Sequence, residues 1–438
     1  MNTTGSDRLA RRVPLVHAQA RRTLRLSLSL GLIAVATAVA GEARWVPMHL
    51  FLSGAVVLAI SGTSQLFTVT WSTAPAPLDG WASAQRWTIA LGAIGVVASR
   101  RGDAPEAVVG LAGTLYVFGL VLLGVLLAST AARGRKRRFD PAVATYLGAV
   151  AFGLIGVALG VRMAVDGPHT SLRSAHLVAN LLGLVGLVVG GTLPYFAATV
   201  GRSRMSGHAT TRRLWCLASW QAAALSGATT ALAVGTPRAA AAALVGYATG
   251  IAAVIALLPR PSRRQLRWAG PRLVALWTGA AWWAMAVIVA ARAASRAEPL
   301  LADRWLVVLV VAGYGQILWG SLAYLLPMLR GGGPERLAAG FASTRSWFGL
   351  AAINSAGIAT AVGLPRIAGA ALAAATIDAT WRAARAGTSR PSVPVHPEGS
   401  VPMTASRRQP LTRYLDPRTM NKHCAGQDRP ADRKGGPP

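Results

Sequence analysis

The feature of this sequence that most constrains its fold is a succession of apolar stretches, most of them roughly 17–25 residues long. A helix of about 20 apolar residues spans the hydrocarbon core of a bilayer. Inside lipid, every backbone N–H and C=O group must be hydrogen-bonded within the protein, which favours helices. The stretches lack the alternation that is typical of membrane β-barrels. The sequence therefore predicts an all-α, polytopic membrane helix bundle.

We expect about 12 transmembrane helices, and three regions along the chain. Residues 1–23 form a basic cytoplasmic arm, residues 24–385 the transmembrane bundle, and residues 386–438 a disordered cytoplasmic tail rich in Pro, Arg, Ser, Thr and Gly. The expected spans are 24–40, 48–70, 86–99, 105–129, 142–162, 175–199, 215–234, 239–258, 272–291, 304–328, 346–363 and 365–382.

The charge is strongly positive, with 45 Lys and Arg against 15 Asp and Glu. These basic residues lie between the apolar stretches, as in the RGRKRR run at 133–138, so a nucleic-acid partner is not needed to explain them. They concentrate in the N-terminal arm and in the loops after the fourth, sixth and eighth spans, which share one side of the membrane if there are twelve spans. The positive-inside rule then places both termini in the cytoplasm of a multi-pass plasma-membrane protein, with anionic inner-leaflet lipid beside the basic loops.

The start of the chain also has a second interpretation. Residues 1–40 resemble a signal peptide, because an Arg-rich arm and an apolar core precede the small residues of AVAGEA at 38–43. Cleavage there would leave eleven spans and would not change the later topology.

Three histidines are expected near the outer face. His49 opens the second span, His169 precedes the sixth span and His176 opens it. Neutral imidazole is a good ligand for heme iron and for copper, so His49 and His176 could form one heme or copper site, with His169 as a further metal-ligand candidate. The alternative is that each is an interfacial residue bonded to a loop. The segments HLFLSG (49–54) and HLVANLLG (176–183) are only weakly similar, and no repeat is evident.

Polar residues also occur inside the expected spans. They could line a cavity, or could hydrogen-bond neighbouring helices as polar groups often do in membranes. No expected span carries a clear mid-membrane Asp, Glu or Lys, which weakens the alternative of an ion-coupled small-solute transporter or permease. The polar residues are Gln65, Asn180, Gln221, Tyr314, Gln316, Tyr324 and Asn354.

Three stretches resemble a known family of bacterial membrane domains. They are MHLFLSGAVVLAISGTSQLFTVTWSTAPAP (48–77), HLVANLLGLVGLVVGGTLPYF (176–196) and GYGQILWGSLAYLLPMLRGGGPER (313–336). They are similar to the actinobacterial domains that accompany copper nitrite reductase-type multicopper oxidases, and more distantly to NnrS-like proteins and heme-copper oxidase subunit I. This resemblance implies about twelve spans, ligand histidines toward the outer face, and a separate multicopper oxidase or nitrite reductase as partner.

The sequence departs from that family in its metal ligands. The resemblance leads us to expect HxHLNLLG in the sixth span, but Val178 occupies the position of the second histidine. Heme-copper oxidase subunit I needs six metal-binding histidines, and the membrane region here offers at most three. A complete oxygen reductase is therefore not expected. We rank a redox or metal-associated membrane protein first, a cofactor-free scaffold second and a transporter third.

Overall fold

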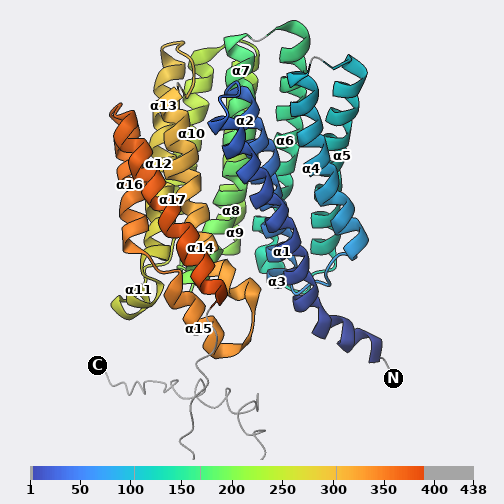
Figure 1. The fold of residues 1–438 in the computed structure, drawn as a ribbon, viewed down its shortest axis with the longest axis vertical. Coiled ribbons are helices and arrows are strands. Elements are labelled where there is room, and N and C mark those ends of the chain that lie inside the picture. The colour runs from blue at the N-terminus through green and yellow to red at the C-terminus, as the bar shows by residue number, and fades with distance from the viewer. Residues whose placement is uncertain (1–2, 103, 168, 302, 389–438) are drawn as a thin grey trace, which may run out of the picture. The chain divides into compact units, whose positions relative to one another are not determined.

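In the computed structural model, residues 3–102, 104–167, 169–301 and 303–388 are described, and all regular elements there are helices (Figure 1). The first long helices are α1 (Thr3–Val39), α4 (Asp79–Arg101), α5 (Glu106–Ala132), α6 (Asp140–Asp166), α9 (Thr211–Ala233) and α10 (Pro237–Ala256). They are followed by α12 (Pro271–Ser295), α16 (Trp347–Ala361) and α17 (Pro365–Thr388). Shorter helices are η2 (Arg137–Phe139), α11 (Arg263–Ala269) and α15 (Gly333–Ser343).

Three further long helices change their winding part of the way along. Each consists of an α-helical start, a π-helical segment and an α-helical end. They are α2 (Trp45–His49), η1 (Leu50–Val56) and α3 (Val57–Ser72); α7 (Thr170–Leu177), η3 (Val178–Val185) and α8 (Gly186–Gly201); and α13 (Asp303–Val307), η4 (Val308–Gly315) and α14 (Gln316–Arg330). We call them the three central helices.

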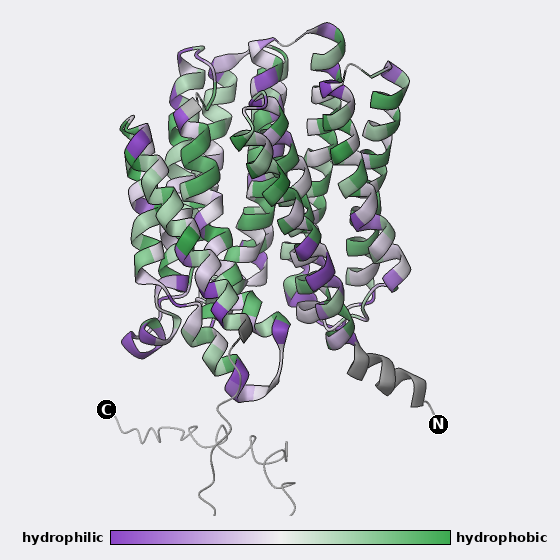
Figure 2. Cartoon of the chain, viewed as in Figure 1, coloured by the Kyte–Doolittle hydropathy of each residue, from purple (hydrophilic) through white to green (hydrophobic). Residues whose placement is uncertain are grey.

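Within the described residues, eight helices are long and apolar enough to cross a membrane. Large hydrophobic side chains such as Phe118 and Ile288 are more than half exposed on the outside of the bundle, as expected for groups that face lipid. Figure 2 shows hydrophobic residues along the helices and hydrophilic ones gathered toward their ends. The chain is thus a multi-pass membrane protein. The eight are α1 from Arg12, the three central helices, α5, α6 together with η2, α10 and α12.

The other four expected spans coincide with α4, α9, α16 and α17. These helices are shorter or less apolar than the eight: α16 has 15 residues, and α4 contains Asp79, Arg86, Arg100 and Arg101. Their formation as helices is shown, whereas their crossing of the membrane stays a prediction.

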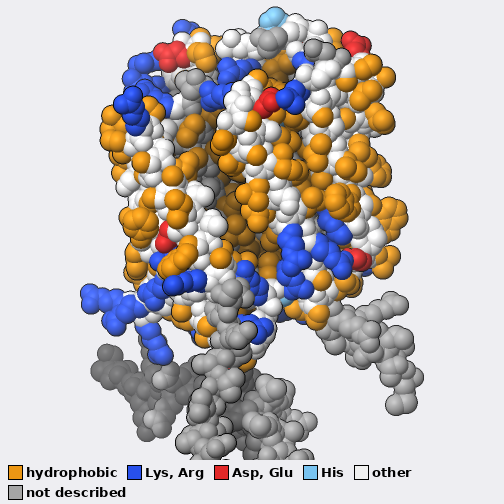
Figure 3. Space-filling view, viewed as in Figure 1, with side chains coloured by type: hydrophobic (Ala, Val, Ile, Leu, Met, Phe, Trp, Pro, Cys, Tyr) orange, Lys and Arg blue, Asp and Glu red, His pale blue; other side chains and the backbone are white. Residues whose placement is uncertain are grey.

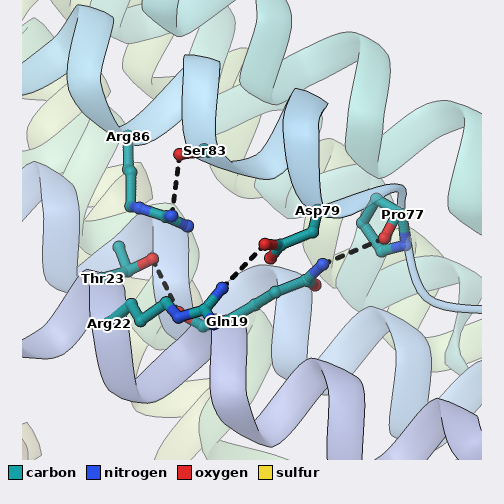
Figure 4. Close-up of polar contacts among 7 residues, drawn as sticks. All are labelled: Gln19, Arg22, Thr23, Pro77, Asp79, Ser83 and Arg86. Carbon is teal, nitrogen blue, oxygen red and sulfur yellow. Dashed lines mark hydrogen bonds and ion pairs between the residues drawn. The ribbon is translucent and has the colours of Figure 1, made fainter.

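The expected arm and first span form one helix, because α1 is continuous through residue 23. Residues 19–22 of α1 contact the start of α4 and the loop before it (Figure 4). Gln19 donates to the Pro77 carbonyl oxygen (3.0 Å), and Arg22 pairs with Asp79 (2.7 Å). On α4, Arg86 donates to Ser83 (2.8 Å). The arm is therefore attached to the bundle by polar contacts. Most of the expected tail, from residue 389, lies outside the described residues.

The long helices fall into three successive groups of four, and each central helix is the second of its group. In each group the first two helices contact each other, as do the last two. Between groups, each central helix contacts the first helix of another group: α3 contacts α6, α8 contacts α12, and α14 contacts α1. The arrangement is a cyclic, approximately threefold bundle.

A repeated glycine lies where the first two helices of each group contact each other. Gly62, Gly191 and Gly320 lie on the central helices at an interval of 129 residues (62 to 191, 191 to 320), and each is followed by Thr or Ser. A Cβ atom at these glycines would lie 3.3 Å from Thr23, 1.8 Å from Thr145 and 2.8 Å from the Arg272 carbonyl oxygen, which all belong to the first helix of the same group. The missing side chain allows the two backbones to approach closely. No repeat was expected from the sequence, and the structure shows one in the arrangement of its helices.

The central helices meet in the core. Phe67 of α3 lies 5.4 Å from Phe196 of α8, whose ring meets Tyr324 of α14 edge-on at 5.8 Å, measured between centroids. The groups do not close evenly around this core. On the face drawn in Figure 3, the surface is hollowed between α17 and the α1–α2 region, and hydrophobic side chains line the hollow.

Candidate functional site

His49 lies where its central helix changes from α to π winding. It is the last residue of α2, and its Nδ1 atom is 2.9 Å from the Trp45 carbonyl oxygen. The imidazole stacks on the Trp45 ring with 4.2 Å between centroids. Because a carbonyl oxygen only accepts hydrogen bonds, Nδ1 of His49 must carry the proton. The lone pair of the neutral imidazole is then on Nε2.

His176 has the same protonation for the same reason. It lies near the end of α7, with Nδ1 2.8 Å from the carbonyl oxygen of Gly156 on α6. Two glycines of α6 provide the space that this contact needs. A Cβ atom at Gly160 would lie 3.3 Å from His176 Cε1, and one at Gly156 would lie 2.2 Å from the amide of Asn180. The ring is thus held against α6 with Nε2 as its lone-pair nitrogen.

The two imidazoles are near enough to interact electrostatically, so the structure brings His49 and His176 to the same region of the bundle. Each is fixed through Nδ1 by a backbone carbonyl. This is the hydrogen bond that a metal-binding histidine usually makes with its second nitrogen. Each ring therefore has Nε2 as its potential metal-binding nitrogen, and the two rings belong to two different central helices.

Side chains four residues further along bond the backbone carbonyl groups of both histidines. The Asn180 amide donates to the His176 carbonyl oxygen (2.9 Å), and the Ser53 hydroxyl donates to that of His49. Single-turn π segments are often found at functional sites. Here they place an irregular stretch of backbone directly after each histidine.

Two tyrosines from other helices also bind the η3 backbone. Tyr314 of η4 donates to Leu181 O and Tyr247 of α10 donates to Leu182 O, each at 2.9 Å. Gly186 leaves room for both hydroxyl groups. Tyr314 was among the polar residues expected inside the spans, whereas Tyr247 was not, because nothing in the local sequence shows which carbonyl a tyrosine will reach. Both tyrosines act as contacts between helices.

Other buried polar residues also join helices. Ser61 and Gln65 of α3 hydrogen-bond the Gln85 side chain of α4 at 2.7 and 3.1 Å. Asn354 of α16 accepts from the Trp282 indole at 3.0 Å. These contacts support the interpretation of the polar residues as links between helices rather than as the lining of a transport path.

His169 differs from the other two histidines. It is exposed and immediately precedes α7, where its carbonyl oxygen accepts from Arg173 N at 2.9 Å. Within the described residues no group of three or more His, Cys, Asp or Glu side chains could hold a metal ion. The candidate site therefore consists of two imidazoles.

Fold and site together define a multi-pass helical membrane protein with a half-buried pair of imidazoles. No known protein family, curated protein or solved structure matches the chain.

Proposed function

We propose that this chain is a twelve-span plasma-membrane protein, with both termini in the cytoplasm and the two imidazoles toward the outer face. Two observations support it. The three groups of four long helices match the number of expected spans, and an even number returns the chain to its starting side. The runs of basic residues at 133–138 and 202–213 lie at the same end of the bundle as the start of α1 (Figure 1), as the positive-inside rule requires for a cytoplasmic end.

We further propose that His49 and His176 bind heme iron, which would make the chain a redox protein of the membrane. The observation that carries this proposal is the matched pair of Nδ1–carbonyl bonds, which leaves both Nε2 lone pairs available. A heme needs only two axial protein ligands because the porphyrin supplies the other four, whereas a copper ion normally needs three or more ligands. Two imidazoles fit the first requirement better, and copper is the second candidate.

When bound, such a heme would supply one-electron transfer. The protein's own contribution is to orient the two rings: Trp45 stacks against one, and Gly156 and Gly160 hold the other. The electron partner suggested by the family resemblance is a separate multicopper oxidase or nitrite reductase at the outer face. Its role stays a prediction.

The test is a visible absorption spectrum of the detergent-purified protein, oxidised and then reduced with dithionite, with metal analysis of the same sample. We expect a heme spectrum in the native protein and its loss in both His49→Ala and His176→Ala. His208→Ala is the matched control, since His208 is exposed in the loop before α9. A spectrum free of heme and a sample free of copper, from well-folded native protein, would overturn the proposal and favour a cofactor-free scaffold.

A further inference from the structure

A cavity lies at the opposite end of the bundle from the imidazoles. It has a volume of about 640 Å³, within the usual range for small-molecule sites. Its wall is built by the end of α3, by η2, and by the end of α8 with the loop that follows. The lining residues are Trp71, Arg138, Phe139, Tyr195, Ala198, Thr199, Arg202, Ser203, Arg204 and Met205.

Backbone contacts fix this wall in place. The amides of Arg135 and Lys136 both donate to the Ser72 carbonyl oxygen at the end of α3, at 2.8 and 3.1 Å. The Tyr195 hydroxyl donates to the Arg138 carbonyl oxygen at 3.0 Å. The loop before η2 is therefore bound to α3 and η2 itself to α8, and these bonds fix the wall of the cavity between them.

One side of the cavity is aromatic. Trp71, Phe139 and Tyr195 lie mutually within 5.2–5.6 Å, measured between ring centroids. With Ala198 and Met205 they offer an apolar surface of the kind that an acyl chain or glycerol backbone can contact.

The cavity is also cationic. Arg138, Arg202 and Arg204 line it, and in the part of the chain that the structure describes none of the three is paired with a carboxylate. Asp140, which is close in sequence, is paired with Arg137 instead (3.7 Å). The cavity thus carries three positive charges without a carboxylate partner.

A buried arginine lies near Arg202, on the same tryptophan ring. Arg272 is 2% exposed, and one of its terminal nitrogens has no hydrogen-bond partner among the described residues. Its guanidinium and that of Arg202 lie 5.6 and 3.6 Å from the Trp268 ring, and the charged groups near enough to interact with it are Arg202 and Arg345. Arg272 donates to the carbonyl oxygens of Ala269 (3.2 Å) and Trp268 (3.1 Å), and its charge adds to the positive potential around Arg202.

We propose that this cavity binds the phosphate group of an anionic membrane phospholipid. The three arginines would bind the phosphate oxygens, since guanidinium groups suit phosphate geometry. The aromatic side would contact the glycerol and the first carbons of the acyl chains. A lipid is favoured over free phosphate because the cavity pairs its cations with an apolar wall at one end of the membrane-crossing helices, where basic pockets commonly bind lipid head groups.

The experiment compares the full-length protein with two triple variants in detergent. The pocket variant is Arg138→Gln/Arg202→Gln/Arg204→Gln. The matched control, Arg212→Gln/Arg263→Gln/Arg264→Gln, removes the same charge from exposed residues at the same end of the bundle. Phosphatidylglycerol, phosphatidylcholine or inorganic phosphate is titrated in, and bound lipid is counted by native mass spectrometry while the melting temperature is recorded. Size-exclusion chromatography checks folding, and Arg138→Gln alone replaces the triple variant if that variant aggregates.

We expect phosphatidylglycerol to bind the native protein and the control at least roughly tenfold more tightly than the pocket variant. Phosphatidylcholine should bind weakly, and millimolar phosphate should not displace the anionic lipid. If phosphate alone stabilises the native protein and displaces the lipid, free phosphate is the ligand and the lipid proposal is wrong. Equal binding to both variants, or equal binding of both lipids, would overturn the site. None of these results depends on the imidazole pair, so this inference and the proposed function can fail separately.

Discussion

The three central helices share a backbone but not their chemistry. All three contain a π-helical segment, and all three place a glycine against the first helix of their group. Only two of them carry histidine near the start of that segment. At the repeat interval of 129 residues, His49 corresponds to Val178 and Val307, and His176 corresponds to Trp305. The third helix forms its π segment without an imidazole, so the irregular winding belongs to the architecture, and the histidines are an addition to two of the three copies.

The largest effect is expected from a substitution that disrupts the glycine contact shared by the three groups. Gly191→Leu would place a side chain where even a Cβ atom comes within 1.8 Å of Thr145 Oγ1, so the first and second helices of that group must separate. We expect a loss of about 3 kcal/mol or more in the free energy of unfolding. The measurement is the fraction of protein that remains monodisperse after heating.

Gly110→Leu is the control for this substitution. Gly110 is exposed on α5 and nothing lies within 4 Å of a Cβ atom there. That variant should be as stable as the native protein, because leucine favours helix and the site is open. Equal stability of the two variants would contradict the role of the repeated glycine.

A smaller effect is expected from a substitution beside His176, one of the histidines by which the three groups differ. Asn180→Ala removes the amide that donates to the His176 carbonyl oxygen. We expect a cost of about 1 kcal/mol in stability, as for a typical hydrogen bond. If His176 is a ligand, cofactor retention should also fall about tenfold, because groups that support a ligand commonly have such effects. Equilibrium dialysis against a competing heme-binding protein would measure retention, and an unchanged value would argue against a supporting role.

The smallest effect concerns His169, the third candidate histidine. His169→Ala removes an exposed ring that precedes α7. We expect less than about 0.5 kcal/mol change in stability, as for most surface substitutions, and an unaltered absorption spectrum. A changed spectrum would show that His169 also contributes to the site, which would then contain three imidazoles instead of two.

Much of this fold follows from local composition, which is why it could be predicted. Hydropathy is a property of a short window, and the membrane helices were expected where the structure has them. His49 and His176 were expected near each other because each lies at the start of an expected span on the same side, whereas their pairing as ligands stays a prediction. The repeat could not be recognised in the sequence, because along the central helices the three copies share only a glycine and the Thr or Ser that follows it. The other positions are mostly apolar residues that can substitute for one another. Tyr247 and Gln85 were missed because their partners are far away in the sequence.

The repeated glycine also has a consequence for the history of the gene. A unit with an even number of membrane crossings begins and ends on the same side, so it can be copied head-to-tail without turning any copy upside down. Three such copies, each about 129 residues long, would account for Gly62, Gly191 and Gly320 and for the cyclic contacts between groups. A symmetric ancestor of this kind would have had three equivalent positions at which a histidine could arise. The present chain would then be a record of divergence, in which two copies came to hold different histidines and the third holds none.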